Sequence, residues 1–376
     1  MKKTFFITLA ILAVIFLITS LLGKNYLYKA IYYNFVDIDD YTIFHNRTVN
    51  IGTPQPWPVS KDYNKIKLSD SLDKAMTDFE SVAFLVVKND SLNFEEYWDS
   101  YSDSSHSGSF SMAKSIVSIL VGIALDEGKI KSLDDPISNY DAEIAQDGIG
   151  KITFRQLLMM SGGTNWDESY LSPLSVTAEA YYGDNLKKLM IHLKAVRPAG
   201  TIFSYKSGET QLLAMVLEKA VGETLSDYAS EKLWKPLGAE YPALWSLDHK
   251  NGQEKAYCCF NSNARDFARF GKLYEHDGNW NGKQIVDSAY VAQSLTPNKL
   301  PDEDGYTVDY YGYLWWLLPY KGHRIFYMQG LLGQYVIVIP DKNLILVRLG
   351  SKRGDHKGNH TYEVVYDMVD WALKTY

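Results

Sequence analysis

The sequence predicts an α+β fold: one antiparallel sheet of five strands, flanked by helices and joined to a mostly helical subdomain. Two observations support this prediction. Strand-like runs cluster near the front and the back of the chain, at residues 81–88, 92–98, 323–329, 334–339 and 344–350. The long stretch between them, residues 129–300, has mostly helical patterns and few strand signals. We therefore expect both ends of the chain to build one sheet and the middle to form a helical insertion.

Residues 1–23 are predicted to be an N-terminal membrane anchor or signal. Lys2 and Lys3 precede residues 4–22, a run of 19 uncharged and mostly apolar residues that is long enough to cross a bilayer. We expect an uncleaved anchor, because no convincing cleavage site follows the run. The positive N-terminus favours the cytoplasmic side, which would place the rest of the chain in the periplasm or outside the cell. Cleavage of the segment would instead give a secreted protein.

Residues 24–75 form a lead-in segment that is rich in Tyr, Asp, Asn and Pro. We expect this segment to lie over the domain that follows, and its tyrosines suit either a membrane interface or packing on that domain. The domain itself spans residues 76–376. Its first two strands form a hairpin around a turn at residues 89–91, and the next helix, residues 111–125, is apolar nearly all round and therefore buried.

The helical insertion contains three further predicted helices. They cover residues 152–160 with Thr153 as N-cap, residues 211–221, and residues 263–275 with Asn263 as N-cap. The last two strands are joined by a turn at residues 340–343, and a helix over residues 361–374 closes the chain.

Composition excludes several classes of function. The chain has 376 residues, a net charge of −7 and a pI near 5.7, which gives no support to nucleic-acid binding, because that function needs a basic patch. Cys258 and Cys259 are adjacent. Because a disulfide between neighbours strains the backbone, we expect two buried free thiols. The sequence shows no Cys and His spacing typical of a metal site, and we expect neither a metal nor an organic cofactor.

The first candidate catalytic residues lie at the start of the helix over residues 111–125. Ser111 and Lys114 are three residues apart, which places both side chains on one helix face. A serine hydroxyl is a weak nucleophile until a base takes its proton. A lysine buried at a helix N-terminus can lose its charge and act as that base. On its own the pair is a common pattern, and a serine at a helix start is usually a simple N-cap.

Two later segments add to this pair. Tyr205 and Ser207 lie in a loop before a helix, where a tyrosine hydroxyl near cations would have a lowered pKa and relay a proton to a leaving group. Residues 328–334 join two late strands, and Gly330 would allow close approach to the helix start. The backbone N–H groups of Ser111 and Leu331 would then form an oxyanion hole. The alternative without a function is ordinary turn chemistry around Tyr205 and Ser207, and a hairpin with glycines at its turn for residues 328–334.

Taken together, Ser-x-x-Lys, Tyr-x-Ser and a glycine-bearing strand resemble the serine β-lactamase-like superfamily. Within it, the chain resembles the branch of class C β-lactamases, esterases and D-alanyl-D-alanine carboxypeptidases, and most of all the 6-aminohexanoate-dimer hydrolase-like members. The resemblance covers roughly residues 75–375. It is also carried by segments 126–137, 152–163, 264–271 and 278–285. It implies a β-lactamase/transpeptidase-like fold with Ser111, Lys114 and Tyr205 as catalytic residues, and with substrate-binding positions at Ser207, Met328, Gln329 and Gly330.

The chain departs from the family pattern at its third motif. The family usually has Lys or His where this chain has Met328, and Met has no charge to hold a substrate carboxylate. Ser207, in place of the usual Asn, also makes a carboxylate-bearing substrate less expected. β-Lactams and peptidoglycan stem peptides both present such a carboxylate, so we expect other substrates, unless Lys206 or Arg324 supplies the missing charge.

The sequence therefore predicts a serine hydrolase that cleaves a small-molecule amide or ester through an acyl-enzyme on Ser111. One alternative is a non-catalytic binding protein on the same fold, because fold alone does not fix function. Another is a β-lactamase or D-alanyl-D-alanine carboxypeptidase proper.

Overall fold

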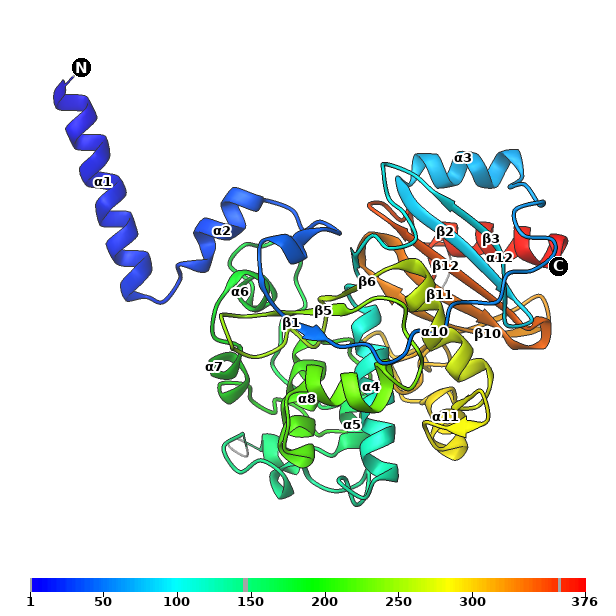
Figure 1. Ribbon diagram of the computed structural model, residues 1–376. Helices are drawn as coiled ribbons and strands as arrows, with labels where there is room; N and C mark the ends of the chain where they lie inside the picture. The colour runs from blue at the N-terminus through cyan, green and yellow to red at the C-terminus, as the bar shows by residue number, and fades with distance from the viewer. Residues whose placement is uncertain (1, 145–147, 358–359) are drawn as a thin grey trace.

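The structure is a computed structural model that describes residues 2–144, 148–357 and 360–376. Its main element is an antiparallel sheet with the strand order β3-β2-β12-β11-β10-β9. The strands are β2 (Ser81–Lys88), β3 (Ser91–Tyr97), β9 (Trp316–Tyr320), β10 (His323–Gly330), β11 (Gln334–Ile339) and β12 (Leu344–Gly350). The predicted fold class is confirmed, and all five predicted strands are present. Leu85 on β2 lies opposite Val347 on β12, so both ends of the chain close one sheet as expected (Figure 1).

The sheet has six strands rather than the predicted five. The additional strand, β9, pairs with β10 at the edge of the sheet, where Pro319 lies opposite Arg324. A proline lacks the backbone N–H that a central strand must donate, so it is tolerated only at an edge. The short length of β9 and the proline within it hid this strand from the sequence pattern.

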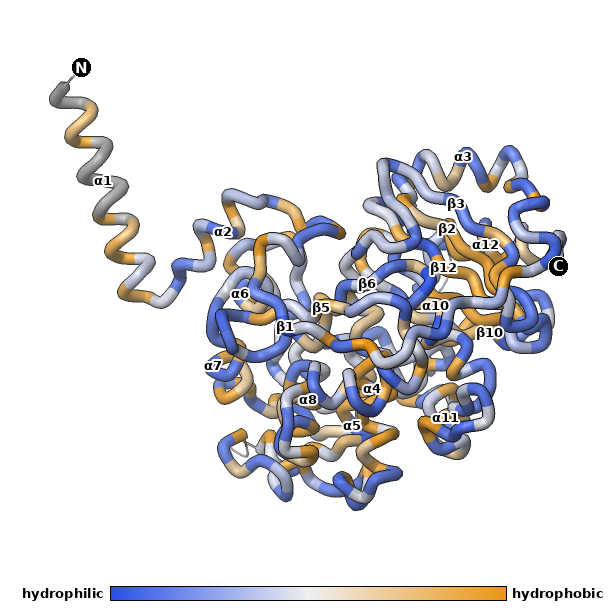
Figure 2. The backbone as a smooth tube through the Cα atoms, in the orientation of Figure 1, coloured by the Kyte–Doolittle hydropathy of each residue, from blue (hydrophilic) through white to orange (hydrophobic). Residues whose placement is uncertain are grey.

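Helices cover both faces of the sheet. On one face α4 (Met112–Asp126) and α10 (Ala264–Glu275) pack against β10, β11 and β12, and on the other lie α3 (Asp70–Asp78) and α12 (Glu363–Thr375). Gly271 allows α10 to come close, because a Cβ there would lie 2.8 Å from a methyl carbon of Ile345. The strands are strongly hydrophobic in Figure 2, as expected for a sheet that is buried on both faces.

The middle of the chain is mostly helical, as predicted. Its helices are α5 (Phe154–Leu158), α6 (Val176–Tyr182), α7 (Leu186–Ile191), α8 (Ser207–Val221), α9 (Leu225–Ala229) and α11 (Ser288–Ser294). Thr153 and Asn263 cap α5 and α10 as predicted, and α8 begins four residues earlier than expected, at Ser207. Shorter elements are 3₁₀ turns at Asp40–Thr42, Ile137–Asn139, Ile149–Lys151, Leu331–Gly333 and Pro340–Lys342, a π turn at Ser230–Trp234, and the β7 (Asn279–Trp280) and β8 (Lys283–Gln284) hairpin.

A second sheet, which the sequence did not predict, lies beside the helical region. Its strand order is β1-β5-β6-β4, and its members are β1 (His45–Val49), β5 (Ala243–Leu247), β6 (Phe260–Ser262) and β4 (Ser107–Gly108). Gly108 on β4 pairs with Asn261 on β6. This pairing places the chain that leads into α4 directly beside the chain that follows Cys259.

The N-terminal part of the chain contains α1 (Lys2–Leu21) and α2 (Tyr26–Tyr33), and α1 extends away from the body in Figure 1. Within the residues that the structure describes, none of the helices is long and apolar enough to cross a membrane. The predicted membrane span over residues 4–22 is therefore not supported. The lead-in segment does lie on the domain, since α2 packs against α6, β1 pairs with β5 and Trp57 is buried.

Candidate active site

The start of α4 presents the serine of the Ser-x-x-Lys pair. Ser111 occupies the N-cap position of α4, but its side chain makes no capping hydrogen bond. The preceding residue, Phe110, has a φ of 43°, a left-handed conformation that is uncommon for a bulky side chain. The chain thus turns sharply just before the helix and exposes Ser111 to a cavity.

Lys114 lies one turn further along α4, with its ammonium group next to the serine. Its Nζ is 2.9 Å from Ser111 Oγ, 3.0 Å from Ser207 Oγ and 2.9 Å from the backbone oxygen of Tyr257. The side chain is only 1% exposed. The structure therefore brings three of the predicted site residues, Ser111, Lys114 and Ser207, into one hydrogen-bonded cluster.

The partners of Lys114 fix the direction of its lone pair when the amine is neutral. The carbonyl of Tyr257 can only accept a hydrogen bond, so the amine must donate to it. The hydroxyl of Ser207 donates its own hydrogen to Glu168, at 2.6 Å, and must therefore accept from Lys114. A neutral amine has two hydrogens and one lone pair. Both hydrogens are used, and the lone pair is left for the hydroxyl of Ser111.

Glu168 is a central member of this network that the sequence reasoning missed. Its carboxylate accepts hydrogen bonds from the backbone N–H and the hydroxyl of Ser207, both at 2.6 Å, from the indole of Trp166 at 2.8 Å, and from the hydroxyl of Tyr170. It also lies at the N-terminus of α8, where a negative charge is favourable. The surrounding loop has no distinctive spacing from Ser111, so the sequence carried no signal that could have identified it.

The pKa values of Lys114 and Tyr205 are shifted in opposite directions. Burial lowers the pKa of Lys114 to about 8, and the negative charge of Glu168 works against this shift. Burial raises the pKa of Tyr205 above its usual range, and the hydroxyl of Ser111 and the charge of Arg353 offset only part of this. The expectation of a lowered tyrosine pKa is therefore wrong: Lys114 Nζ lies over the Tyr205 ring, 5.0 Å from its centre, but burial outweighs the nearby cations. Tyr205 is a neutral phenol at pH 7.

The end of β10 approaches the start of α4 closely. A Cβ on Gly330 would lie 2.2 Å from the backbone oxygen of Ser109, so only glycine fits there. The next residue, Leu331, lines the cavity together with Ser111. Among the described residues, neither the N–H of Ser111 nor that of Leu331 has a hydrogen-bond acceptor in the protein. Both groups are thus available for an oxygen atom of a bound molecule.

A buried arginine holds the loop that carries Leu331. The guanidinium of Arg348 donates to the carbonyls of Leu332 at 3.1 Å and Gly333 at 2.7 Å, and to Ser81 Oγ at 3.0 Å. Its side chain is fully buried, and burial lowers its pKa to about 10. Since these carbonyls lie directly after Leu331, Arg348 fixes the position of the Leu331 N–H.

The rest of the third motif lies away from the cavity lining. Met328 is fully buried in the core under the sheet, and Gln329 is 8% exposed. Neither residue, nor Gly330, lines the cavity that contains Ser111, whereas Ser207 does. The alternative cations are also directed elsewhere, because Lys206 donates to the carbonyl of Thr164 and Arg324 is exposed at the far end of β10.

The cavity beside Ser111 has a volume of about 610 Å³, within the usual range for small-molecule sites. Its lining contains no Asp, Glu, Lys, Arg or His side chain from the described residues. It consists of Ala30, Ile31, Asn34, Phe35, Val36, Phe110, Ser111, Ser169, Tyr170, Leu171, Ser172, Pro173, Thr177, Ala178, Tyr181, Tyr182, Ser207, Tyr257, Cys258, Leu331 and Leu332. The arrangement is an uncharged, largely apolar pocket with a serine hydroxyl and two backbone N–H groups at one side.

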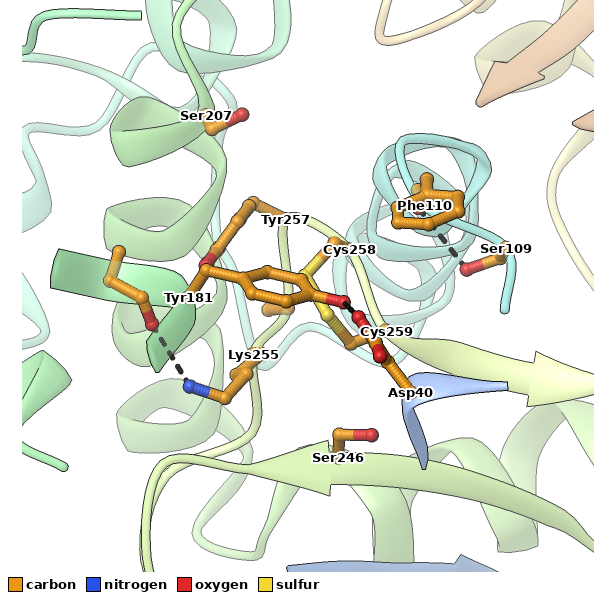
Figure 3. The surroundings of a disulfide bond; sticks show 12 residues. Asp40, Ser109, Phe110, Tyr181, Ser207, Ser246, Lys255, Tyr257, Cys258 and Cys259 are labelled. Atoms are coloured by element: carbon orange, nitrogen blue, oxygen red, sulfur yellow. Dashed lines mark hydrogen bonds between the residues drawn. A yellow bond between two sulfur atoms is a disulfide. The ribbon is translucent and has the colours of Figure 1, made fainter. Parts of the chain in front are cut away.

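Cys258 and Cys259 form a disulfide, so the predicted free thiols are a wrong prediction (Figure 3). Cys259 has a φ of 67°, and the tight turn that this left-handed conformation creates accommodates the pairing of neighbours. Cys258 lines the cavity, and the preceding Tyr257 provides the carbonyl that accepts from Lys114. The disulfide thus lies on the segment that orients Lys114.

In the part of the chain that the structure describes, one group of side chains offers ligand atoms for a metal ion, and its residues are not among those that line this cavity. Asp90, Glu275 and His276 lie close together at the end of α10, with the amine of Lys272 already 3.5 Å from Asp90. None of the three lines the cavity.

Comparison with known proteins agrees with the fold. The model of the beta-lactamase family matches residues 68–365, and the chain therefore belongs to the beta-lactamase family. It is 25% identical to the 6-aminohexanoate-dimer hydrolase of Paenarthrobacter ureafaciens over 300 residues, which cover 76% of this chain and 75% of that protein.

Solved structures also share the fold. The chain solved as "Putative 6-aminohexanoate-dimer hydrolase from Bacillus anthracis" is similar with a TM-score of 0.76 and 24% identity, covering 89% of this chain and 92% of that one. A family VIII carboxylesterase is similar with a TM-score of 0.64 and 15% identity, covering 85% and 99%. At these identities the two solved structures show the fold alone. The family match and the relative from Paenarthrobacter ureafaciens support a hydrolase in general terms.

Proposed function

We propose that this protein is a serine hydrolase that cleaves a neutral ester or amide through an acyl-enzyme on Ser111. One observation carries the proposal: Lys114 Nζ lies 2.9 Å from Ser111 Oγ, and its other hydrogen-bond partners leave the lone pair of the neutral amine for that hydroxyl. This is the geometry of a nucleophile and its general base.

We assign one group of the chain to each step of the proposed reaction. Lys114 takes the proton of Ser111 as Oγ attacks the carbonyl carbon, and the N–H groups of Ser111 and Leu331 stabilise the negative oxygen. Tyr205, a neutral phenol, donates its proton to the leaving oxygen or nitrogen and regains one from Lys114. A water molecule then attacks the acyl-enzyme, its proton passes to the same base, and Ser111 is released with its proton restored.

The charge of the pocket favours neutral substrates. Neither the cavity lining nor Met328 offers a cation to a substrate carboxylate, and Arg353 stacks on the ring of Tyr362 outside the lining. A charge-assisted hydrogen bond contributes roughly 1.5–3 kcal/mol, so its absence lowers turnover of anionic substrates by about one to two decades. The turnover of neutral esters and amides is not lowered, because they have no carboxylate that needs a cation. The names of the relatives, a 6-aminohexanoate-dimer hydrolase and a carboxylesterase, support both bond types.

The first prediction compares a neutral ester with a penicillin. We expect the wild-type protein to hydrolyse a p-nitrophenyl ester with a kcat/KM at least about tenfold higher than that for benzylpenicillin. The reason is that the penicillin carboxylate finds no cation in the cavity lining. The Ser111→Ala variant serves as the background for both substrates. A kcat/KM for penicillin above that for the ester would refute the preference for neutral substrates.

The second prediction concerns the pH dependence. Because the base must be neutral and burial lowers the pKa of Lys114 to about 8, kcat/KM should rise about tenfold per pH unit up to pH 8 and then level off. The phenol of Tyr205, with its raised pKa, should not add a second transition below pH 10. Since Glu168 raises the pKa of Lys114, Glu168→Gln should move the acidic limb to lower pH.

The control for this measurement is Asp167→Asn, which removes a charge one residue away on an exposed side chain without touching Ser207. Its profile should match that of the wild type. A profile that is flat between pH 6 and 9, or a limb that Glu168→Gln moves to higher pH, would be incompatible with Lys114 as the base.

A further inference from the structure

We propose that the cavity beside Ser111 is an acyl-chain site whose outer wall is α2, so that the enzyme takes neutral substrates with an apolar acyl chain longer than acetyl. This inference rests on the proposed function, since it assigns the substrate class of the same site. It concerns a part of the chain that lies outside residues 68–365, where the family model matches.

The wall of the cavity opposite the body of the domain comes from α2 and the residues that follow it. Ala30, Ile31 and Asn34, with the next residues Phe35 and Val36, line the cavity together with Ser111. The N-terminal segment is thus part of the pocket and not only a connection to α1. Without these five residues the cavity would be open on this side.

Contacts to the domain hold α2 in this position. Ala30 is buried, the ring of Tyr33 stacks on that of Tyr182 with 6.4 Å between their centres, and Lys24 forms an ion pair with Glu179 at the start of the segment. These contacts involve α6, whose residues also line the cavity. The wall is therefore attached to the domain through α6, which borders the same cavity.

Several large apolar side chains around the cavity remain uncovered. Ile31 is 71% exposed, Phe35 is 77% exposed, and Leu171, which lines the cavity from another segment, is 95% exposed. Single exposed apolar residues are ordinary, but a group of them around one cavity marks a surface that binds an apolar partner. Because Ser111 lines the same cavity, the occupant that fits is the apolar chain of the acyl group attached to that serine.

The expected preference for longer acyl chains follows from the burial of their methylene groups. Each CH₂ that leaves water for an apolar pocket should raise kcat/KM by about fourfold, which corresponds to about 0.8 kcal/mol. Octanoate has six methylenes more than acetate. If half of them are buried, the ratio of kcat/KM for the octanoyl and acetyl esters should approach about 10².

The test measures kcat/KM for p-nitrophenyl acetate, butyrate, hexanoate, octanoate and dodecanoate. The wild type should favour octanoate over acetate by about 10²-fold. In the double variant Ile31→Ser and Phe35→Ser this ratio should fall by about tenfold or more, because the chain then meets a polar wall. The matched control is Tyr32→Ser, on the same helix and 82% exposed but outside the lining, which should keep the wild-type ratio.

The possible results distinguish a failure of the acyl-chain site from a failure of the proposed serine hydrolase activity. Equal kcat/KM for acetate and octanoate in the wild type, or a double variant that keeps the wild-type ratio, would overturn the acyl-chain site and leave the serine hydrolase intact. Failure of the wild type to cleave any of the esters would overturn both.

Discussion

Replacing Lys114 with arginine should reduce the rate of acylation by about 10²–10⁴-fold at pH 7, the range that a general base contributes. An arginine stays protonated in a protein and cannot accept the proton of Ser111. The larger guanidinium must also fit a site that is 1% exposed and has three close oxygen partners. The measurement is the pre-steady-state burst with a p-nitrophenyl ester, which reports acylation directly.

The control for this variant is Lys272→Arg. Lys272 is a nearly buried lysine on α10 whose amine lies over the ring of Trp280, and it does not line the cavity. It tests whether an arginine at a buried lysine position harms the protein in general, and its burst should match that of the wild type. An acylation rate within tenfold of the wild type for a folded Lys114→Arg variant would exclude Lys114 as the base.

Replacing Gly330 with alanine should reduce kcat by about 10²–10³-fold, the loss that follows removal of one oxyanion-hole donor. The φ of Gly330 is −123°, which any residue adopts, so the problem is space and not backbone strain. A Cβ would lie 2.2 Å from the carbonyl oxygen of Ser109. The end of β10 must therefore move away from α4 and take the N–H of Leu331 with it.

This loss should appear in kcat more than in KM, because the N–H acts on the negative charge of the transition state. Gly52→Ala is the matched control. The nearest atom to a Cβ there would be Cβ of Lys235, at 3.2 Å, and neither residue lines the cavity. An unchanged kcat in a folded Gly330→Ala variant would contradict the assignment of the Leu331 N–H to the oxyanion hole.

The sequence predicted the parts of the structure that rest on local pattern. The five strands have continuous apolar or alternating runs, and α4 is apolar on every side, so both could be predicted without tertiary information. Thr153 and Asn263 were identified as caps because capping depends on one side chain and the next turn. The spacing of Ser111 and Lys114 was informative for the same reason.

The parts that the sequence did not predict depend on contacts between distant segments. Glu168 acts through Ser207, 39 residues away, and no pattern connects the two. The pKa of Tyr205 follows from burial, which outweighed the nearby cations that the sequence suggested. The disulfide at Cys258 needed the left-handed turn at Cys259, and the role of α2 as a cavity wall needed its packing on α6.

The central claim is that Ser111 is a nucleophile activated by Lys114, and covalent labelling with a fluorophosphonate probe tests it most directly. Intact mass and peptide mapping should show one adduct per chain, on the peptide that contains Ser111. The adduct should be absent from Ser111→Ala and should form much more slowly in Lys114→Arg. A folded wild-type protein that takes no label would contradict the account and favour a binding protein on the same fold, and equal labelling of Ser111→Ala would place the nucleophile elsewhere.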